Sequence, residues 1–154
     1  MASRVFDELP EEIVRLLKQE QYVTVSTIEP KNSTPDVHAV SWVYAASPRI
    51  LRFAVDARAS AVKNLRETPG MAMTVIGGGT TYSIAGKGKI LTTEVSGISF
   101  PLAIIEVEVV EVKDVMFYGS KMLRGPVFEK TYDPEAAEEL DNKVLEAMSN
   151  IHGM

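Results

Sequence analysis

Six β-prone segments follow one another between residues 22 and 112, and only one short helical segment interrupts them. The segments are 22–28, 37–46, 50–55, 71–76, 81–92 and 102–112. A parallel, doubly wound sheet needs long crossover helices between its strands, and this stretch of sequence has none. The pattern therefore predicts a mainly β fold. We expect a six-stranded antiparallel barrel, closed or partly split, with flanking helices.

Glycine residues mark the bends of this predicted barrel. Gly77–Gly79 is expected to form a hairpin turn, because no lysine–serine or lysine–threonine pair follows it as in a phosphate loop. Gly86 and Gly88 indicate a bend or a bulge. The alternation of LAIIEVEVVEV (102–112) slips at Val109 and Val110, which indicates a bulge in that strand as well.

Helices are expected on both sides of the barrel, at 10–19 and at 134–150. Asp133 caps the second helix, and Pro134 begins it. Its apolar stripe serves core or dimer packing and consists of Ala137, Leu140, Val144, Leu145, Met148 and Ile151. The irregular segment 113–132 is aromatic and basic, so it should pack on something. We interpret residues 1–154 as one domain built around the barrel 22–112.

Composition excludes several classes of function. The 154 residues carry a formal net charge of -5, which argues against a nucleic-acid binder and against binding to anionic membranes. No apolar run is long enough to span a bilayer, and the N-terminus lacks the order of a secretory signal, so we expect a cytoplasmic protein. Without cysteine there is no disulfide or thiolate nucleophile, and His38 and His152 are too few for a zinc site.

The segment ILRFAVDARASAVKNLRETPG (50–70) is the strongest local candidate for a site. It predicts a strand that ends at Asp56, followed by a short helix capped by Ser60. The free N–H groups and the positive end of this helix, with Arg58 before it and Lys63 inside it, would suit a phosphate group. Taken alone, these residues equally fit a plain helix cap with two solvated cations, and that interpretation is the commoner one.

The order of these elements, together with YVTVSTI, HAVSWVYA, RILRFAVDARASAVKNL and TTYSIAGKGKI, resembles the flavin (FMN)-binding split-barrel family related to pyridoxamine 5'-phosphate oxidase. The resemblance covers residues 11–112. It implies a homodimer whose barrels pair and bind FMN at their interface. It also implies that the strand before the short helix, together with that helix, holds the cofactor phosphate.

The resemblance assigns residues to the cofactor by position. The family's phosphate loop falls on Asp56 to Lys63, where Arg58 and Ser60 would contact phosphate oxygens and Lys63 would add charge. Many members have a lysine two residues after the loop serine, whereas this chain has Val62 there. The residues that would line the ribityl chain and the ring are His38, Ser41, Trp42 and Val55.

Three of these lining residues also have a plain structural interpretation. Trp42 would flank the ring or serve as a large core or interface anchor. Ser41 would hydrogen-bond the flavin or face water. His38 fits a polar residue at a strand end better than a general base.

The function implied by the resemblance is an FMN-binding oxidoreductase that passes electrons between a reduced nicotinamide or other donor and a small molecule of unknown identity. The C-terminal arginine and histidine motif of pyridoxamine phosphate oxidation is not found here, and a long helix ends the sequence instead. Alternatives are a deazaflavin (F420)-dependent reductase on the same scaffold, a flavin-storing or flavin-sensing dimer linked to stress, and an empty barrel without cofactor.

Overall fold

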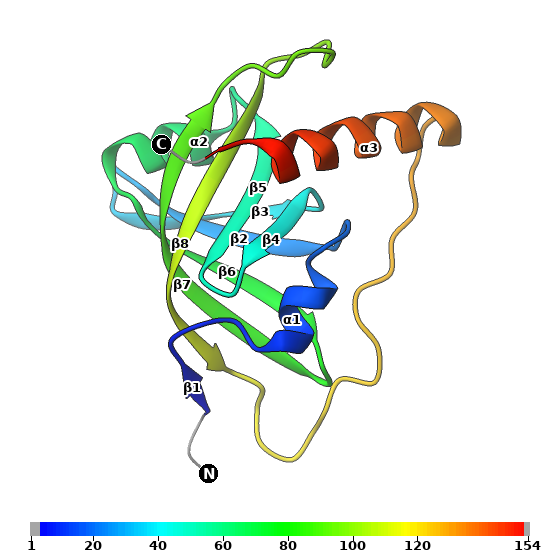
Figure 1. Ribbon diagram of the computed structural model, residues 1–154. Helices are drawn as coiled ribbons and strands as arrows, with labels where there is room; N and C mark the ends of the chain where they lie inside the picture. Colours follow the sequence, from blue (N-terminus) through cyan, green and yellow to red (C-terminus); the bar gives the residue numbers. More distant parts are fainter. Residues whose placement is uncertain (1–3, 153–154) are drawn as a thin grey trace.

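The computed structural model describes residues 4–152, which form eight strands and three helices (Figure 1). The strands are β1 (Val5–Phe6), β2 (Val23–Glu29), β3 (Thr34–Val40), β4 (Val43–Ser47), β5 (Ile50–Asp56), β6 (Gly70–Gly77), β7 (Thr80–Thr92) and β8 (Leu102–Asp114). The helices are α1 (Glu11–Leu16), α2 (Ser60–Glu67) and α3 (Pro134–Asn150).

The strands form one antiparallel sheet in the order β3-β2-β6-β7-β8-β5-β4, with β1 paired to β8 off this path. Among the described residues, the end strands β3 and β4 do not pair with each other, so the barrel is split. The predicted mainly β, antiparallel split barrel with flanking helices is thus confirmed. The predicted number of six strands is wrong, because β1 is an additional strand and 37–46 forms two strands.

The division of 37–46 has a physical cause at Ser41 and Trp42. β3 pairs with β2, whereas β4 pairs with β5, so the chain changes its partner strand between them. At the change, Ser41 donates a hydrogen bond to Glu20 and Trp42 donates one to Asp141, both outside the sheet. These long-range partners are invisible to a count of β-prone residues.

Both predicted irregularities of the long strands are present. The register of β7 and β8 shifts between Ala85 and Gly86, which pair with Glu111 and Val109, so that Val110 is the extra residue of a bulge. A Cβ atom at Gly86 would lie 2.7 Å from the backbone oxygen of Glu108, so only glycine fits. The hairpin turn between β6 and β7 is also confirmed, with positive φ at Gly78 and Gly79.

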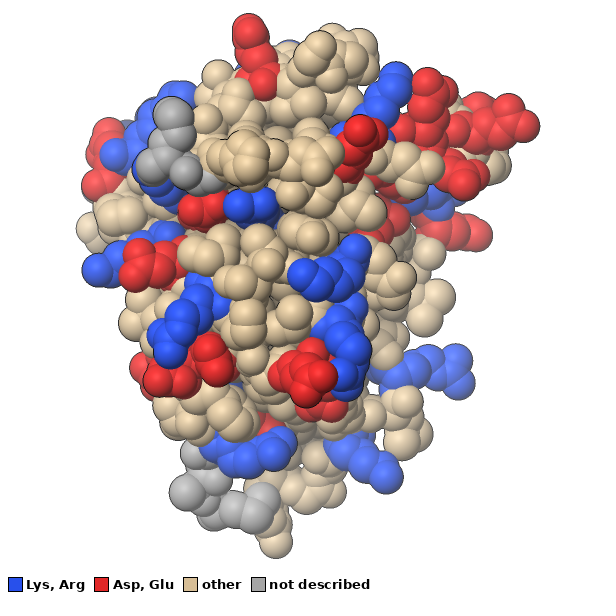
Figure 2. Space-filling view, viewed as in Figure 1, with Lys and Arg blue, Asp and Glu red and all other residues tan. Residues whose placement is uncertain are grey.

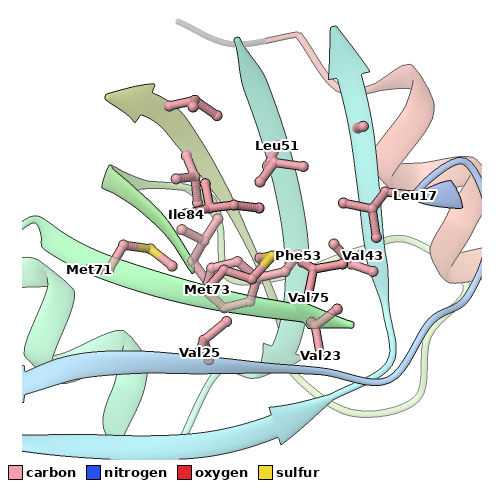
Figure 3. Close-up of a cluster of buried hydrophobic side chains, with 14 of the residues drawn as sticks. Leu17, Val23, Val25, Val43, Leu51, Phe53, Met71, Met73, Val75 and Ile84 are labelled. Atoms are coloured by element: carbon pink, nitrogen blue, oxygen red, sulfur yellow. The ribbon is translucent and has the colours of Figure 1, made fainter. Parts of the chain in front are cut away.

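Two apolar clusters lie on opposite sides of the sheet. The larger fills the barrel (Figure 3) and includes Val23, Val25, Val43, Leu51, Phe53, Met73, Val75 and Ile84. The smaller lies between the sheet and α3, where Ala54, Leu102 and Ile104 meet Val144 and Met148. Successive residues at the start of β8 therefore enter different clusters, which explains why this strand reads as a continuous apolar run.

The flanking segments follow the expectations in part. α3 has the predicted bounds 134–150 and packs its stripe on the smaller cluster, with Asp133 accepting a hydrogen bond from Ala136 N as its cap. α1 is shorter than the predicted 10–19, and β8 extends past the predicted barrel end at 112. Figure 2 shows acidic side chains gathered at the beginning of α3, at the upper right.

The connection from β8 to α3 was expected to pack on the rest of the chain, and in large part it does not. Hydrogen bonds connect it to the rest of the fold. Met122 N donates to Gly79 O, and the Lys130 side chain donates to Glu20. Several of its large apolar side chains are exposed, namely Phe117, Tyr118, Leu123, Val127 and Phe128. A long apolar surface of this chain is therefore left open.

Candidate functional site

The turn from β5 into α2 is held in place from both sides. Asp56 accepts hydrogen bonds from Arg58 N and Ala59 N, which shape the turn. Within α2, Val62 and Leu65 are buried in the larger cluster. A helix of eight residues gains little stability by itself, so this packing is what fixes the position of its first turn.

The first turn of α2 is not capped in the predicted way. Ala59 occupies the N-cap position, and no side chain caps the helix. Ser60 is the first helical residue, and its hydroxyl donates to Asp36 Oδ2 at 2.6 Å and lies 3.2 Å from His38 Nε2. The prediction that Ser60 caps α2 is therefore wrong, because a carboxylate on β3 takes its proton and directs the hydroxyl away from the helix backbone.

Asp36 and Asn64 complete this cluster, and the sequence did not single out either as a site residue. Asn64 is 2% exposed, and its amide nitrogen donates to Asp36 Oδ2 and to Thr27 Oγ1, both at 3.0 Å. The hydrogen bond from Ser60 lowers the pKa of Asp36 below its usual 3.8, with smaller contributions from His38 and Asn64 that act against burial. One usable signal was present: Asp36 alternates with His38 on β3, so the two share a face.

His38 also lies here, beside Ser60. We call the first turn of α2, together with Asp36, His38, Asp56 and Arg58, the α2 corner. Since the Ser60 proton goes to Asp36, the His38 Nε2 atom is left as a donor to the serine oxygen. His38 Nδ1 is buried and has no hydrogen-bond partner within residues 4–152. The arrangement differs from a catalytic triad, in which the carboxylate would contact Nδ1.

Arg58 already has an anionic partner. Its Nε and Nη2 atoms donate to the two carboxylate oxygens of Asp56 at 2.9 Å and 2.6 Å. This pairing lowers the pKa of Asp56 to about 2 and raises the pKa of Arg58. The Arg58 side chain is 74% exposed, so the pair lies in water and another anion can replace the carboxylate at little cost.

Of the remaining predicted residues, Lys63 lies one turn into α2, whereas the others lie elsewhere or point into the core. Lys63 is exposed on α2 and forms no salt bridge in the part of the chain that the structure describes. Val55 is 8% exposed, and its side chain belongs to the barrel core. Ser41 and Trp42 belong to a second polar cluster beneath α3.

This second cluster borders a cavity of about 350 Å³ between β4 and α3. Trp42 Nε1 donates to Asp141 Oδ1 at 2.8 Å, and its ring stacks on Phe100 with centroids 6.4 Å apart. Lys130 Nζ bridges Glu20 and Asp141 at 2.7 Å and 2.9 Å. Burial alone would lower the pKa of Lys130, but its hydrogen bonds to the two carboxylates outweigh this and raise it. We call this set of residues the α3 cluster; it consists of Glu20, Ser41, Trp42, Lys130 and Asp141.

Two further kinds of feature are absent from the part of the chain that the structure describes. Within residues 4–152, no three histidine, aspartate or glutamate side chains come together as a metal site would require. The helices in the same range are too short or too polar to cross a membrane.

The sequence profile of a family described as Pyridoxamine 5'-phosphate oxidase matches residues 9–116, from the approach to α1 to just beyond β8. The chain belongs to this family. Members of the family typically bind flavin and are commonly dimeric. No curated protein matches the sequence significantly.

Solved structures share the fold at low sequence identity. A pyridoxamine 5'-phosphate oxidase-type protein from Lactobacillus delbrueckii aligns with a TM-score of 0.59 and 17% identity, over 73% of this chain and 98% of its own. An F420 reductase aligns at 0.55 and 22%, over 68% and 98%. HupZ from Group A Streptococcus aligns at 0.58 and 12%, over 74% and 98%. At these identities the likeness concerns the fold alone.

The α2 corner contains some groups that favour a phosphate and others that oppose it. In favour are the uncapped first turn of α2, the exchangeable Arg58 and the exposed Lys63. Against it stand the carboxylates of Asp36 and Asp56, which already hold the Ser60 hydroxyl and the Arg58 guanidinium.

Proposed function

We propose that this chain binds a flavin-type cofactor, FMN or its deazaflavin counterpart F420, and acts as an oxidoreductase on a small molecule. The observation that carries the proposal is the uncapped first turn of α2 beside Arg58 at the end of β5. Membership of the family supports it, because flavin binding is typical of these proteins. The bound cofactor supplies the redox chemistry, with a reduced nicotinamide or another donor as the electron source.

In this proposal the chain's residues bind and position the cofactor. Arg58 exchanges Asp56 for a phosphate oxygen, which costs little because the existing pair is exposed. Lys63 adds a cation from the same helix. His38 lies beside the ribityl chain, next to Ser60. No acid, base or nucleophile of the reaction is assigned to a side chain.

The contacts of Trp42 favour one of its two interpretations. Its indole N–H is bound to Asp141, and its ring stacks on Phe100 against the helix. Such a side chain anchors α3 on the sheet. We accordingly assign the ring-flanking role to residues other than Trp42, and Ser41 shares its position in the α3 cluster through Glu20.

We also propose that the working form is a homodimer with the cofactor at the interface. The exposed apolar surface between β8 and α3 supports this, since a monomer gains nothing from leaving Phe117, Tyr118 and Leu123 in water. The corner at α2 is open to solvent as well, so a second chain would be needed to enclose a ring.

Purified protein tests the proposal through its visible spectrum. We expect a bound flavin or deazaflavin chromophore, either as isolated or after reconstitution, and bleaching when NADH or NADPH is added without air. Binding without bleaching by any donor would indicate a storage or sensing protein rather than an enzyme. Absence of binding to either cofactor class would overturn the proposal, and a strictly monomeric holoprotein in sedimentation would overturn the dimer.

A further inference from the structure

The first turn of α2 already interacts with a carboxylate. Asp36 reaches it from β3 and accepts hydrogen bonds from Ser60 at 2.6 Å and from Asn64 at 3.0 Å. It thus occupies part of the interaction with the positive end of the helix that a phosphate would otherwise have. A ligand phosphate at this turn must lie close to the Asp36 charge.

Asp36 is held far more firmly than the other carboxylate of the corner. Its partner Asn64 is 2% exposed and is itself bound to Thr27 on the neighbouring strand β2. The carboxylate of Asp56, in contrast, accepts hydrogen bonds within residues 4–152 only from the backbone and side chain of Arg58, two residues away on an exposed turn. An incoming anion can therefore displace Asp56 from Arg58, while Asp36 stays in place.

The charges of the corner balance before any ligand enters. The two carboxylates, Asp36 and Asp56, are matched by two cations, Arg58 and Lys63. A phosphodiester brings one negative charge to this set. A terminal phosphate, like that of FMN, brings nearly two at neutral pH.

We propose, on the basis of the cofactor site proposed above, that Asp36 makes this corner select a cofactor whose phosphate carries one negative charge, such as a phosphodiester, over a terminal phosphate monoester. Asp36 is then a specificity-determining residue. A second negative charge a few ångströms from a fixed carboxylate weakens binding by about tenfold or more at the effective dielectric constant of a protein surface.

Three flavins that share one ring system test this selection. They are riboflavin, without a phosphate; riboflavin 4',5'-cyclic phosphate, a phosphodiester; and FMN, a monoester. Their dissociation constants are measured by flavin fluorescence at about pH 7.5, where FMN is mainly a dianion. We expect the wild-type protein to bind the cyclic phosphate about tenfold more tightly than FMN.

The matched variants are Asp36→Asn and Asp7→Asn. Both remove one negative charge, but Asp7 is exposed beside β1, far from α2 in Figure 1. Asp36→Asn should strengthen FMN binding about tenfold and bring the two phosphates within about threefold of each other, with little change for riboflavin. Asp7→Asn should leave the preference unchanged.

A pH series in the wild-type protein gives an independent reading if Asp36→Asn does not fold. Between about pH 7.5 and pH 5.5 FMN becomes mainly a monoanion, so its affinity should approach that of the cyclic phosphate. Asp36 stays ionised throughout, since its pKa lies below 3.8. Of the groups that face it, Ser60, Asn64 and Thr27 do not titrate. Any charge on His38 affects the binding of monoanionic FMN and of the cyclic phosphate equally.

The outcomes distinguish the charge selection by Asp36 from the proposed cofactor binding itself. If wild-type protein binds FMN as tightly as the cyclic phosphate at about pH 7.5, the selection is wrong, although the proposed cofactor site stands. A preference that a folded Asp36→Asn variant leaves intact also refutes the assignment to Asp36. If F420 and all three flavins fail to bind, the proposed function falls, and the selection falls with it.

Discussion

The α2 corner and the α3 cluster contain the same kinds of charged groups in opposite circumstances. At the α2 corner, Arg58 pairs with Asp56 in water and the first turn of the helix is uncapped. Beneath α3, Lys130 bridges Glu20 and Asp141 with its side chain 28% exposed, and Trp42 completes the set. Exposed pairs are exchanged readily, whereas satisfied and partly buried ones stabilise one arrangement. We therefore assign ligand binding to the first region and architecture to the second.

The largest expected effect is on the architectural side. Trp42→Ala removes the stacking on Phe100 and the hydrogen bond to Asp141, and we expect the free energy of unfolding to fall by about 3 kcal/mol. Trp42→Phe keeps the stacking and should cost about 1 kcal/mol. Urea unfolding measures both. A Trp42→Ala protein that keeps its stability but loses flavin binding would place Trp42 in the cofactor site. It would contradict the assignment of ligand binding to the α2 corner and of architecture to the α3 cluster.

Lys130→Met should have the next largest effect. It leaves Glu20 and Asp141 without their shared cation, at a cost of about 1–2 kcal/mol after allowance for partial exposure. Lys143→Met is the matched control on α3, where the pair with Glu139 is exposed and should contribute less than about 0.5 kcal/mol. Equal losses in the two variants would contradict the distinction between the regions.

The same bridge predicts a pH dependence. The pKa of Lys130 is raised in the folded chain, so its contribution is complete below its unfolded pKa of about 10.5 and is lost as the pH rises through the folded value. The stability difference between wild type and Lys130→Met should accordingly shrink in strongly alkaline solution. Unfolding curves measured from neutral to alkaline pH would show a constant difference if the network contributed nothing.

At the α2 corner we expect binding to change and stability to stay nearly constant. Arg58→Ala removes charge-assisted hydrogen bonds to the phosphate, so affinity for a phosphate-bearing flavin should fall about tenfold. The free energy of unfolding should stay close to that of the wild type, because the pair with Asp56 is exposed. Arg66→Ala, on the last turn of the same helix, is the control. A folded Arg58→Ala protein with unchanged affinity would remove Arg58 from the site.

The smallest expected effect concerns the acid stability that Asp36 contributes. Its pKa is lowered in the folded chain, so the contribution is present above the unfolded value near 3.8 and is lost as the pH falls through the folded value. The stability difference between wild type and Asp36→Asn should thus narrow below about pH 3.8. A difference that is the same in neutral and acidic solution would show that Asp36 acts through packing.

The sequence predicted the parts of the fold that depend on local patterns. Alternating apolar residues located the strands, and the phase slip at Val109 and Val110 located the bulge. Asp133 and Pro134 predicted the start of α3 correctly. The division of 37–46 into β3 and β4 was missed, because its cause lies in partners of Ser41 and Trp42 that are distant along the chain.

For the candidate site, too, the sequence predicted contacts between neighbouring residues and missed contacts between distant ones. Asp56, Arg58 and Ser60 lie together at the corner because they are neighbours in sequence, as the spacing predicted. The wrong cap at Ser60 and the omission of Asp36 and Asn64 share one cause, a contact between β3 and α2 across more than twenty residues. The resemblance placed Val55 along the cofactor, and in the structure its side chain belongs to the cluster that fills the barrel.

A crystal structure with a bound flavin would show directly whether the first turn of α2 holds the cofactor phosphate. Crystals grown with riboflavin 4',5'-cyclic phosphate or FMN should place the phosphate within hydrogen-bond distance of the first turn of α2, with Arg58 turned from Asp56 toward it. A flavin that lies in the cavity beneath α3, with the Arg58–Asp56 pair intact and the first turn of α2 empty, would show that the phosphate does not bind at α2.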